Sequence, residues 1–511
     1  MAKTRTQKAA LNTATAALSE IVMLVCGLIL PRLILRHYGS AYNGITSSAK
    51  QFLSAISILN VGIAGTTRVA LYKSLASHDL QKTSGIVKAT ELHMRKVGLV
   101  LTAYVAALMV FYPIFVDTGY GWMEVAPLIF AASLSSFGRY FFGTAYRAFL
   151  TADQSVYINN IFSIASNLLN TLVNVILIRA GCSIQVVRVS AALVLLLNPI
   201  LLSTYVKRKY KLDRHCKPDK SALSMRRDVM AHSIANIVHD HTDVVVLTIF
   251  TDVKIVSVYT VYNLVMSALK KTQMVFTSGT EAVFGNMWAK GELDKIKLNL
   301  GYYEYIVSSF VSVVFSTTLV MILPFISLYT KGVHDVEYVL PAYAAVITIA
   351  QAFYCFRAPY LTLIQGVGHY KQTKRGAYVE AGMNLVLSVL LVQFIGIVGV
   401  AVGTLCANVF RTCQYALYAD KHLVKRGKLV FILRIVWACA NSAVVYFASR
   451  LVFSGFLCDS WFKWVLFAFM VTVFSGIVTL LSSLVFYRRD MIGVKGILLR
   501  VIRRKKRRKA A

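Results

Sequence analysis

The sequence predicts an all-α membrane protein, and three observations support this fold class. Fourteen apolar stretches have about 20 residues each, the length that crosses the hydrocarbon core of a bilayer. The chain is 57% hydrophobic and 15% charged, which argues against a soluble basic protein despite a formal charge of +33. Lys and Arg also gather in alternate connectors. We expect membrane spans at residues 14–36, 45–66, 97–116, 125–147, 156–178, 186–206, 230–250, 255–283, 304–329, 339–365, 375–393, 397–418, 429–450 and 463–487.

The distribution of Lys and Arg predicts which side of the membrane each connector occupies. Connectors on the side of the first residue carry 38 of the 55 Lys and Arg, whereas the connectors on the other side carry seven. Cytoplasmic loops retain basic residues in this way. We therefore expect a multi-pass protein of the cell membrane with both termini in the cytoplasm. The excess charge would contact anionic membrane lipids rather than nucleic acid.

The individual spans differ in polarity. The first follows a basic segment, and we expect a spanning helix there rather than a signal peptide, because Glu20 interrupts the apolar run and no clear cleavage site follows. The second, fourth, seventh and eighth spans carry polar residues. An unpaired charge at the bilayer centre costs a few kcal/mol or more, so these four spans should line a water-filled interior.

A weak internal repeat divides the spans into two pseudo-symmetric bundles. Arg139 precedes Asn167 by 28 residues, and Arg357 precedes Asn384 by 27. Chance similarity between Leu- and Val-rich helices is the alternative. Each bundle has an even number of spans, which predicts parallel repeats with substrate bound between them. We expect a six-helix bundle at 10–207, a second at 226–424, an additional helix pair at 429–487 and a basic cytoplasmic tail at 488–511.

Cations within the apolar spans predict the chemistry of the substrate. Arg139 and Arg357 hold matching positions in the repeat, and the forked guanidinium group suits the oxygens of a diphosphate. The alternatives are an acidic partner or a side chain that reaches the interface. Lys270 and Lys271 fall midway along the eighth span, the most costly depth for a cation. The cavity cations expected to bind substrate are Arg139, Arg357, Lys270, Lys271, Arg32, Arg36 and Arg411.

Arg32 and Arg36 lie four residues apart, so they stack on one face of the first span. An anion nearby would explain this pair, and an ordinary anchor at the outer interface is the alternative. The acids available as counter-ions within the spans are Glu20, Glu281 and Glu380.

The seventh span carries a cluster of His and Asp residues. His239 and His241 point about 200° apart on a helix, so they cannot share a metal ion. His239 and Asp243 share a face, and with Asp240 they are candidates for coupling to an H⁺ or Na⁺ gradient or for pairing between bundles. We expect no metal and no cofactor, because the eight Cys also lack a metal-binding spacing.

Two tyrosines follow the paired arginines. Tyr146 and Tyr360 are candidates for stacking on sugar rings, although interfacial belts also explain many tyrosines in membrane proteins. At the end of the chain, residues 491–502 predict a short amphipathic helix, and residues 503–509 form a polybasic patch. Both features favour contact with anionic lipid.

Five stretches, in order along the chain, carry a family resemblance: 31–44, 59–63, 242–247, 256–262 and 396–404. They resemble Wzx-type polysaccharide flippases of the multidrug/oligosaccharidyl-lipid/polysaccharide exporter superfamily. At 181–188 the chain departs from the family's Gly-rich turn. The resemblance implies two bundles in a V shape and alternating access. It also implies transfer of an undecaprenyl-diphosphate-linked oligosaccharide to the outer leaflet for capsule, exopolysaccharide or other surface glycan synthesis, beside other glycan-assembly proteins.

Three alternatives to this function differ in substrate or in class. A cation-coupled multidrug exporter would favour a cavity rich in carboxylates, whereas here Lys and Arg outnumber them within the spans. A lipid II flippase differs only in the glycan that it moves. A membrane glycan polymerase or ligase would carry a larger external segment, and the short connectors therefore favour a transporter rather than an enzyme.

Overall fold

The computed structural model is helical, and the predicted all-α membrane fold is confirmed. No strand occurs in the part of the chain that the structure describes, which is residues 4–60, 63–77, 79–213, 216–219, 241–277, 279–453, 456 and 458–496. The helices form two compact units, each described here by itself. Unit 1 is Met1–Thr260 with Gly332–Val336, and unit 2 is Val261–Lys331 with Glu337–Ala511.

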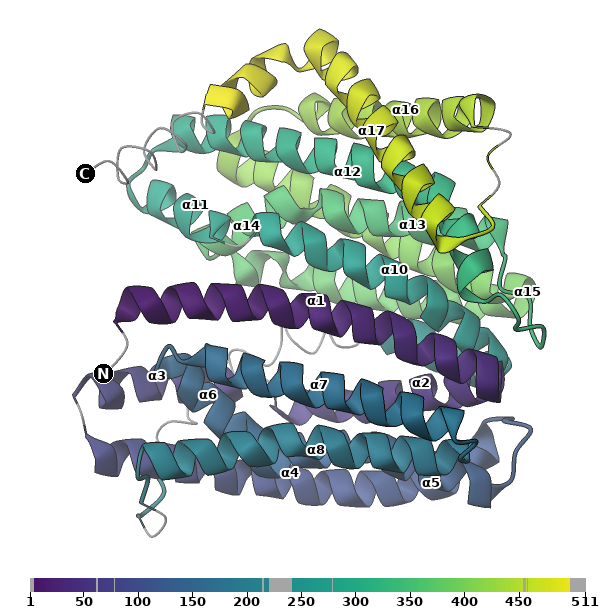
Figure 1. Ribbon diagram of the computed structural model, residues 1–511. Helices are drawn as coiled ribbons and strands as arrows, with labels where there is room; N and C mark the ends of the chain where they lie inside the picture. Colours follow the sequence, from purple (N-terminus) through teal and green to yellow (C-terminus); the bar gives the residue numbers. More distant parts are fainter. Residues whose placement is uncertain are drawn as a thin grey trace. The chain divides into compact units, whose positions relative to one another are not determined.

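Unit 1 contains the first six predicted spans. Helix α1 packs against α7, and α8 packs against α5 and α7 (Figure 1). A 3₁₀ turn, η1, follows α2, and a π-helical turn, η2, joins α5 to α6. The helix His241–Phe250 and the first residues of α10 complete the unit. The bounds are α1 Arg5–Tyr38, α2 Ser40–Ala55, η1 Ile56–Asn60, α3 Ile63–Ala76, α4 Leu80–Phe115, α5 Trp122–Gly138, η2 Arg139–Gly143, α6 Thr144–Ala152, α7 Val156–Arg179 and α8 Ile184–Lys209.

The two ends of unit 1 collect the connectors as the charge pattern predicts. At one end, Lys8 Nζ lies 3.0 Å from Asp153 Oδ2, and the Tyr210 hydroxyl donates to the same oxygen over 2.6 Å. These three residues belong to segments expected on one side of the membrane. At the other end, the Tyr38 hydroxyl donates to the Cys182 carbonyl over 2.6 Å. Helices α7 and α8 therefore run in opposite directions between these two ends.

Unit 2 is organised around α12, which packs against α13, α16 and α17 (Figure 1). Hydroxyl pairs join α12 to α17: Ser312 to Thr479 over 3.1 Å and Ser316 to Ser475 over 2.6 Å. Such hydrogen bonds hold helices together in an apolar environment. The bounds are α10 Val253–Thr277, α11 Thr280–Ala289, α12 Leu293–Tyr329, α13 Pro341–Phe356, α14 Ala358–Val367, α15 Tyr370–Ala419, η4 Asp420–Val424, α16 Leu429–Val452 and α17 Trp461–Phe486.

Each of the fourteen predicted spans coincides at least in part with a helix. Among the described residues, nine helices are long and apolar enough to cross a membrane, and His241–Phe250 is a shorter apolar helix. The chain is therefore a multi-pass membrane protein. Unit 2 includes α16 and α17, which were expected as a separate helix pair, and the predicted bundle boundaries stay predictions. Residues 488–496 form a helix that includes the start of the amphipathic helix expected at 491–502, and residues 497–511 lie outside the described residues.

A kink in α15 joins the eleventh and twelfth predicted spans. Gly396 has φ of 55° and ψ of −135°, a conformation that L-residues rarely adopt. The two halves of α15 then run back along each other, and the Asn384 amide donates to the Thr404 hydroxyl over 2.9 Å. Small residues permit this approach, because a Cβ on Gly403 would lie 2.5 Å from Ser388 Oγ.

Replacing Gly396 with Ala should destabilise unit 2. The strained backbone conformation would cost about 1–3 kcal/mol with a side chain present. We expect a lower thermal unfolding midpoint for the G396A protein in detergent. Gly382→Ala is the matched control, because Gly382 lies in the same helix without a positive φ and a Cβ there meets no atom within 4 Å. Equal midpoints for the two variants would contradict the role of this kink.

Candidate functional site

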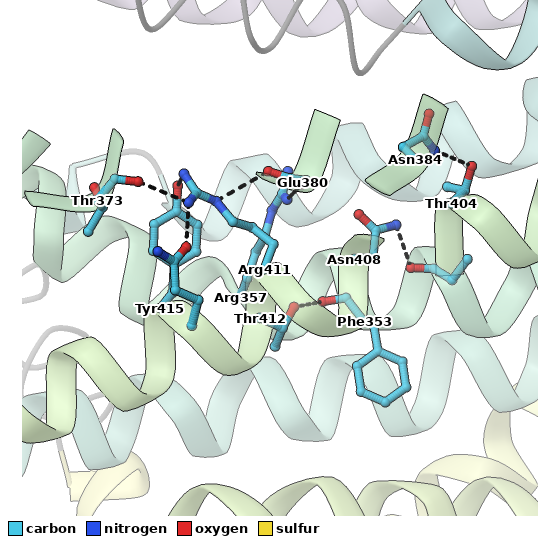
Figure 2. A network of polar contacts seen from close by, with 12 residues as sticks. Phe353, Arg357, Thr373, Glu380, Asn384, Thr404, Asn408, Arg411, Thr412 and Tyr415 are labelled. Atoms are coloured by element: carbon cyan, nitrogen blue, oxygen red, sulfur yellow. Dashed lines mark hydrogen bonds and ion pairs between the residues drawn. The ribbon is translucent and has the colours of Figure 1, made fainter. Parts of the chain in front are cut away.

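A buried ion cluster lies in unit 2, where α13, α14 and both halves of α15 meet. Arg357 Nη1 is 2.6 Å from Glu380 Oε1, and Arg411 Nε is 3.2 Å from Glu380 Oε2. One carboxylate therefore serves two guanidinium groups (Figure 2). Arg357 is 8% exposed, Glu380 is 7% exposed and Arg411 is 3% exposed, so the charges are held within the protein.

The break between α13 and α14 places Arg357 in this cluster. Pro359 has no N–H to donate, so a continuous helix is interrupted just before it. The Phe353 carbonyl, which would accept from the Arg357 N–H in a regular helix, accepts from the Thr412 hydroxyl over 2.8 Å. Nearby, the Asn408 amide donates to the Ala350 carbonyl over 3.0 Å. Figure 2 shows both contacts between α13 and α15.

Arg411 has further partners that fix its orientation. Its Nη1 donates to the Thr373 carbonyl over 3.0 Å, and its Nη2 donates to the Tyr415 hydroxyl over 2.5 Å. The guanidinium carbon lies 4.0 Å from the centroid of the Tyr415 ring. Hydrogen bonds of this kind compensate for the loss of water around a buried charge. These contacts therefore hold the Arg411 side chain in one orientation.

Two cations share one aromatic ring beside the cluster. Lys270 Nζ lies 4.2 Å from the Tyr354 ring centroid, and the guanidinium carbon of Arg357 lies 3.9 Å from it. Cation–π contacts stabilise desolvated positive charge. Taken together, Lys270, Arg357, Arg411 and Glu380 comprise three cations and one carboxylate. This cluster has a formal excess of two positive charges.

A second ion network in unit 2 is electrically balanced. Glu304 Oε1 lies 2.5 Å from Arg426 Nη2, and Glu304 Oε2 lies 3.3 Å from Arg434 Nε. Arg434 Nη2 is also 2.7 Å from Asp490 Oδ2, in the helix that follows α17. Tyr360 is buried beside Glu304, with its ring 5.5 Å from that of Phe431. This network ties the C-terminal helix to α12 and α16, and it carries two cations and two carboxylates.

The expected cations of unit 1 lie in different surroundings. Arg139 is the first residue of η2, and its side chain is exposed without an ion-pair partner among the described residues. The repeat explains the difference from Arg357. Glu380 precedes Asn384 by four residues, and Ser163 stands four residues before Asn167, so the matching position carries no charge. Ser163 instead accepts a hydrogen bond from the Asn198 amide over 2.7 Å.

The remaining candidates are distributed over both units. Arg36 and Lys271 are exposed, and Arg32 is partly buried. Tyr146 is 1% exposed, and its hydroxyl donates to Glu91. A substrate contact for each of these side chains stays a prediction.

The predicted cluster of the seventh span is described only in part. His239 and Asp240 lie outside the described residues. Asp243 is 7% exposed, and the Tyr259 hydroxyl donates to its Oδ2 over 3.4 Å. The His241 ring contacts the Ser54 hydroxyl, with Nδ1 at 3.1 Å. No group of three His, Cys, Asp or Glu side chains in the described ranges is arranged to hold a metal ion.

Several functional candidates went unrecognised in the sequence. Glu304 and Asp490 complete the balanced network. The sequence signal for them is Arg434, a cation within a predicted span that calls for an acidic partner. Lys50 and Arg188 of unit 1 were also missed as candidates. Arg188 Nε is buried without a hydrogen-bond partner among the described residues. Both cations lie within predicted spans, which is the sequence signal available for them.

An apolar groove runs along helix α13 in unit 2. Its volume is about 480 Å³, and it is lined by α12, α13 and α16. Phe353 and Phe356 line the groove, and they flank Tyr354 and Arg357 of the ion cluster in sequence. Arg450 lines it as well, near the end of α16. Helix α13 therefore contributes to both a cationic cluster and an apolar groove.

Comparison with known proteins gives the fold of the chain. No protein-family model matches the chain, and no curated protein matches its sequence. Its structure is similar to that of the lipid II flippase MurJ in an inward closed conformation. The TM-score is 0.69 at 14% identity, over 94% of this chain and 100% of that chain.

Two transporters of the MATE family are also similar in structure. One is an inward-facing multidrug resistance transporter of the MOP superfamily, with a TM-score of 0.59 at 14% identity over 83% of this chain and 95% of that chain. The other is the Vibrio cholerae MATE transporter VcmN in its bent form, with a TM-score of 0.50 at 13% identity over 83% of this chain and 99% of that chain. The chain therefore has the fold of the flippases and transporters of the MOP superfamily.

Proposed function

We propose that this protein is a Wzx-type flippase, which moves undecaprenyl-diphosphate-linked oligosaccharide units from the inner to the outer leaflet by alternating access. The observation that carries the proposal is the positive excess of the Lys270–Arg357–Arg411–Glu380 cluster. A diphosphate crossing the membrane needs cationic groups that replace its water. The product would be a capsule, an exopolysaccharide or another surface glycan.

The pairing of Arg357 with Glu380 bears directly on this role. An acidic partner is one of the alternatives expected for this arginine. Glu380 offsets one positive charge of the cluster, and we infer that the formal positive excess of the four residues attracts an anion. The carboxylate also keeps both guanidinium groups in place, and preorganised donors bind a ligand at lower cost in conformational entropy. We infer that Glu380 positions the arginines and that substrate oxygens approach the excess charge.

The groove suits the lipid part of the same substrate. A polyprenyl tail lying in the groove would stay in apolar surroundings beside α13, while the diphosphate lies near Arg357. Burial of apolar surface gives about 25 cal/mol per Å², so a long tail would add substantially to affinity. A lipid-linked substrate thereby accounts for both the cationic cluster and the adjacent apolar groove of unit 2.

The cluster argues against the multidrug alternative. Cationic drugs favour carboxylates, whereas this cluster holds three cations and one carboxylate. A lipid II flippase is the second candidate, since the structural likeness to MurJ has a TM-score of 0.69. Rescue of cells depleted of their lipid II flippase would favour that candidate. Rescue of a surface-glycan flippase mutant alone would favour the Wzx-type role.

The remaining parts of the proposal concern the setting of the protein. We place it in the plasma membrane with both termini in the cytoplasm, where its basic connectors contact anionic lipids and other glycan-assembly proteins lie close by. Coupling to an H⁺ or Na⁺ gradient would involve Asp243, whose carboxylate is buried beside Tyr259. No cofactor is required for such a transport cycle.

Removing Arg357, Glu380 and Arg411 as a unit should separate a structural role from a role in transport. Glu380→Gln alone leaves two buried arginines without a carboxylate, so we expect it to destabilise the protein by about 3–5 kcal/mol. The triple variant R357M/E380M/R411M replaces all three charges with apolar groups, which is often nearly neutral for stability. Export of the surface glycan should still fall by about tenfold or more, because a charge-assisted contact is lost.

Two measurements check this prediction in the same cells. Thermal unfolding in detergent reports stability, and labelled glycan at the cell surface reports export. Arg147→Met is the control for loss of an in-span arginine that lies outside the cluster and does not line the groove. Normal export by a stable R357M/E380M/R411M protein would show that the three charges only hold the helices together.

Filling the groove should slow transport of long-tailed substrates. Ala345 lines the groove, so Ala345→Phe would occupy part of its volume. Ala342, also on α13, is exposed and does not line the groove, which makes Ala342→Phe the matched control. In proteoliposomes we expect A345F to reduce flipping of an undecaprenyl-linked substrate several-fold more than that of a ten-carbon analogue. Equal effects on both tails would count against tail binding in the groove.

A further inference from the structure

A polar cavity of about 340 Å³ lies within unit 1. It is lined by α4, α6, the end of α8 and the segment that follows α8. The charged and hydroxyl groups that line it come from separate elements, and no step of the proposed transport cycle uses it. These groups belong to Lys88, Glu91, Arg95, Tyr146, Lys207 and Asp213.

One wall of the cavity is a polar face of α4. Ser84, Lys88, Glu91 and Arg95 are spaced by four, three and four residues, so their side chains emerge on one side of the helix. The guanidinium group of Arg95 is exposed and has no ion-pair partner among the described residues. Its donors are therefore available to a ligand in the cavity.

The opposite wall holds a lysine above an aromatic ring. Lys207 Nζ lies 5.1 Å from the centroid of the Tyr146 ring and 3.6 Å from Glu91 Oε1. The Tyr146 hydroxyl donates to the same carboxylate oxygen. A distance of 3.6 Å is beyond a hydrogen bond, so Lys207 keeps N–H donors for another acceptor. Glu91 therefore positions Lys207 and Tyr146 without satisfying the ammonium group.

The segment after α8 is fixed at the edge of this cavity. The Asp213 N–H donates to the Ser84 hydroxyl over 3.1 Å, and the Asp219 N–H donates to the Gly85 carbonyl over 3.0 Å. A Cβ on Gly85 would lie 3.0 Å from the Lys217 carbonyl oxygen, so glycine permits the close contact. A ligand in the cavity would contact both α4 and the start of the connector between the two predicted bundles.

We propose that this cavity binds the phosphate group of an anionic ligand, with Arg95 and Lys207 as its principal contacts. Arg95 and Lys207 both line the cavity, and guanidinium and ammonium groups are the usual protein ligands of phosphate. The volume exceeds that of phosphate alone and lies in the range of small-molecule sites. Two sources share this chemistry: the headgroup of an anionic lipid and a soluble phosphorylated compound. The proposal is independent of the flippase function.

Binding to the purified full-length protein in detergent tests the proposal. The soluble probe is inorganic pyrophosphate, and the lipid probe is phosphatidic acid in mixed micelles, with phosphatidylcholine for comparison. Arg95→Gln and Lys207→Gln should each weaken binding about tenfold, because each loses a hydrogen bond to a charged group. Lys96→Gln is the matched control, since Lys96 adjoins Arg95 on α4 and does not line the cavity.

The probes and variants together decide the outcome. Binding of pyrophosphate that is sensitive to Arg95→Gln supports a soluble ligand, and binding of phosphatidic acid alone with the same sensitivity supports a lipid headgroup. Thermal unfolding identifies any variant that fails to fold, and exposed Arg95 should be tolerant of substitution. The proposal is overturned if neither probe binds, or if Lys96→Gln weakens binding as much as Arg95→Gln does.

Discussion

The contact of one buried carboxylate with two arginines is the interaction on which unit 2 depends. Glu380 lies in the first half of α15, Arg411 in the second half, and Arg357 at the junction of α13 and α14. Three helical segments are thereby fixed at one point within an apolar surrounding. Such a contact is costly to leave incomplete, because each unpaired buried charge carries a desolvation penalty of several kcal/mol. The kink at Gly396 is what allows the two halves of α15 to meet there.

The cluster that includes this contact has a formal excess of positive charge. In the Glu304 network, two cations meet two carboxylates, as expected of a structural tie between helices. In the Glu380 cluster, two arginines share one carboxylate, and Lys270 shares the Tyr354 ring with Arg357. This contrast within one unit separates a structural ion network from one suited to an anionic ligand. The adjoining apolar groove along α13 suits the lipid tail of such a ligand.

Hydropathy and charge predicted most of the fold, because the length and composition of a spanning helix depend on local sequence. The kink in α15 and the break at Arg357 follow from Gly396 and Pro359, although the sequence alone does not give their angles. Arg357, Lys270 and Arg411 were predictable from their depth, and Glu380 was a candidate counter-ion. The sharing of Glu380 by the two arginines, and of the Tyr354 ring by Arg357 and Lys270, was not predictable, since it depends on how helices pack. The uncharged Ser163 at the position that matches Glu380, by contrast, can be read from the sequence.

The most direct test of the central claim is the affinity of the purified protein for undecaprenyl diphosphate, undecaprenyl monophosphate and undecaprenol. If the excess charge of the cluster recognises a diphosphate, affinity should fall in that order, and replacing both Arg357 and Arg411 with Gln should remove most of the difference. Equal affinity for the three lipids, or an order unchanged in a folded double variant, would contradict the account.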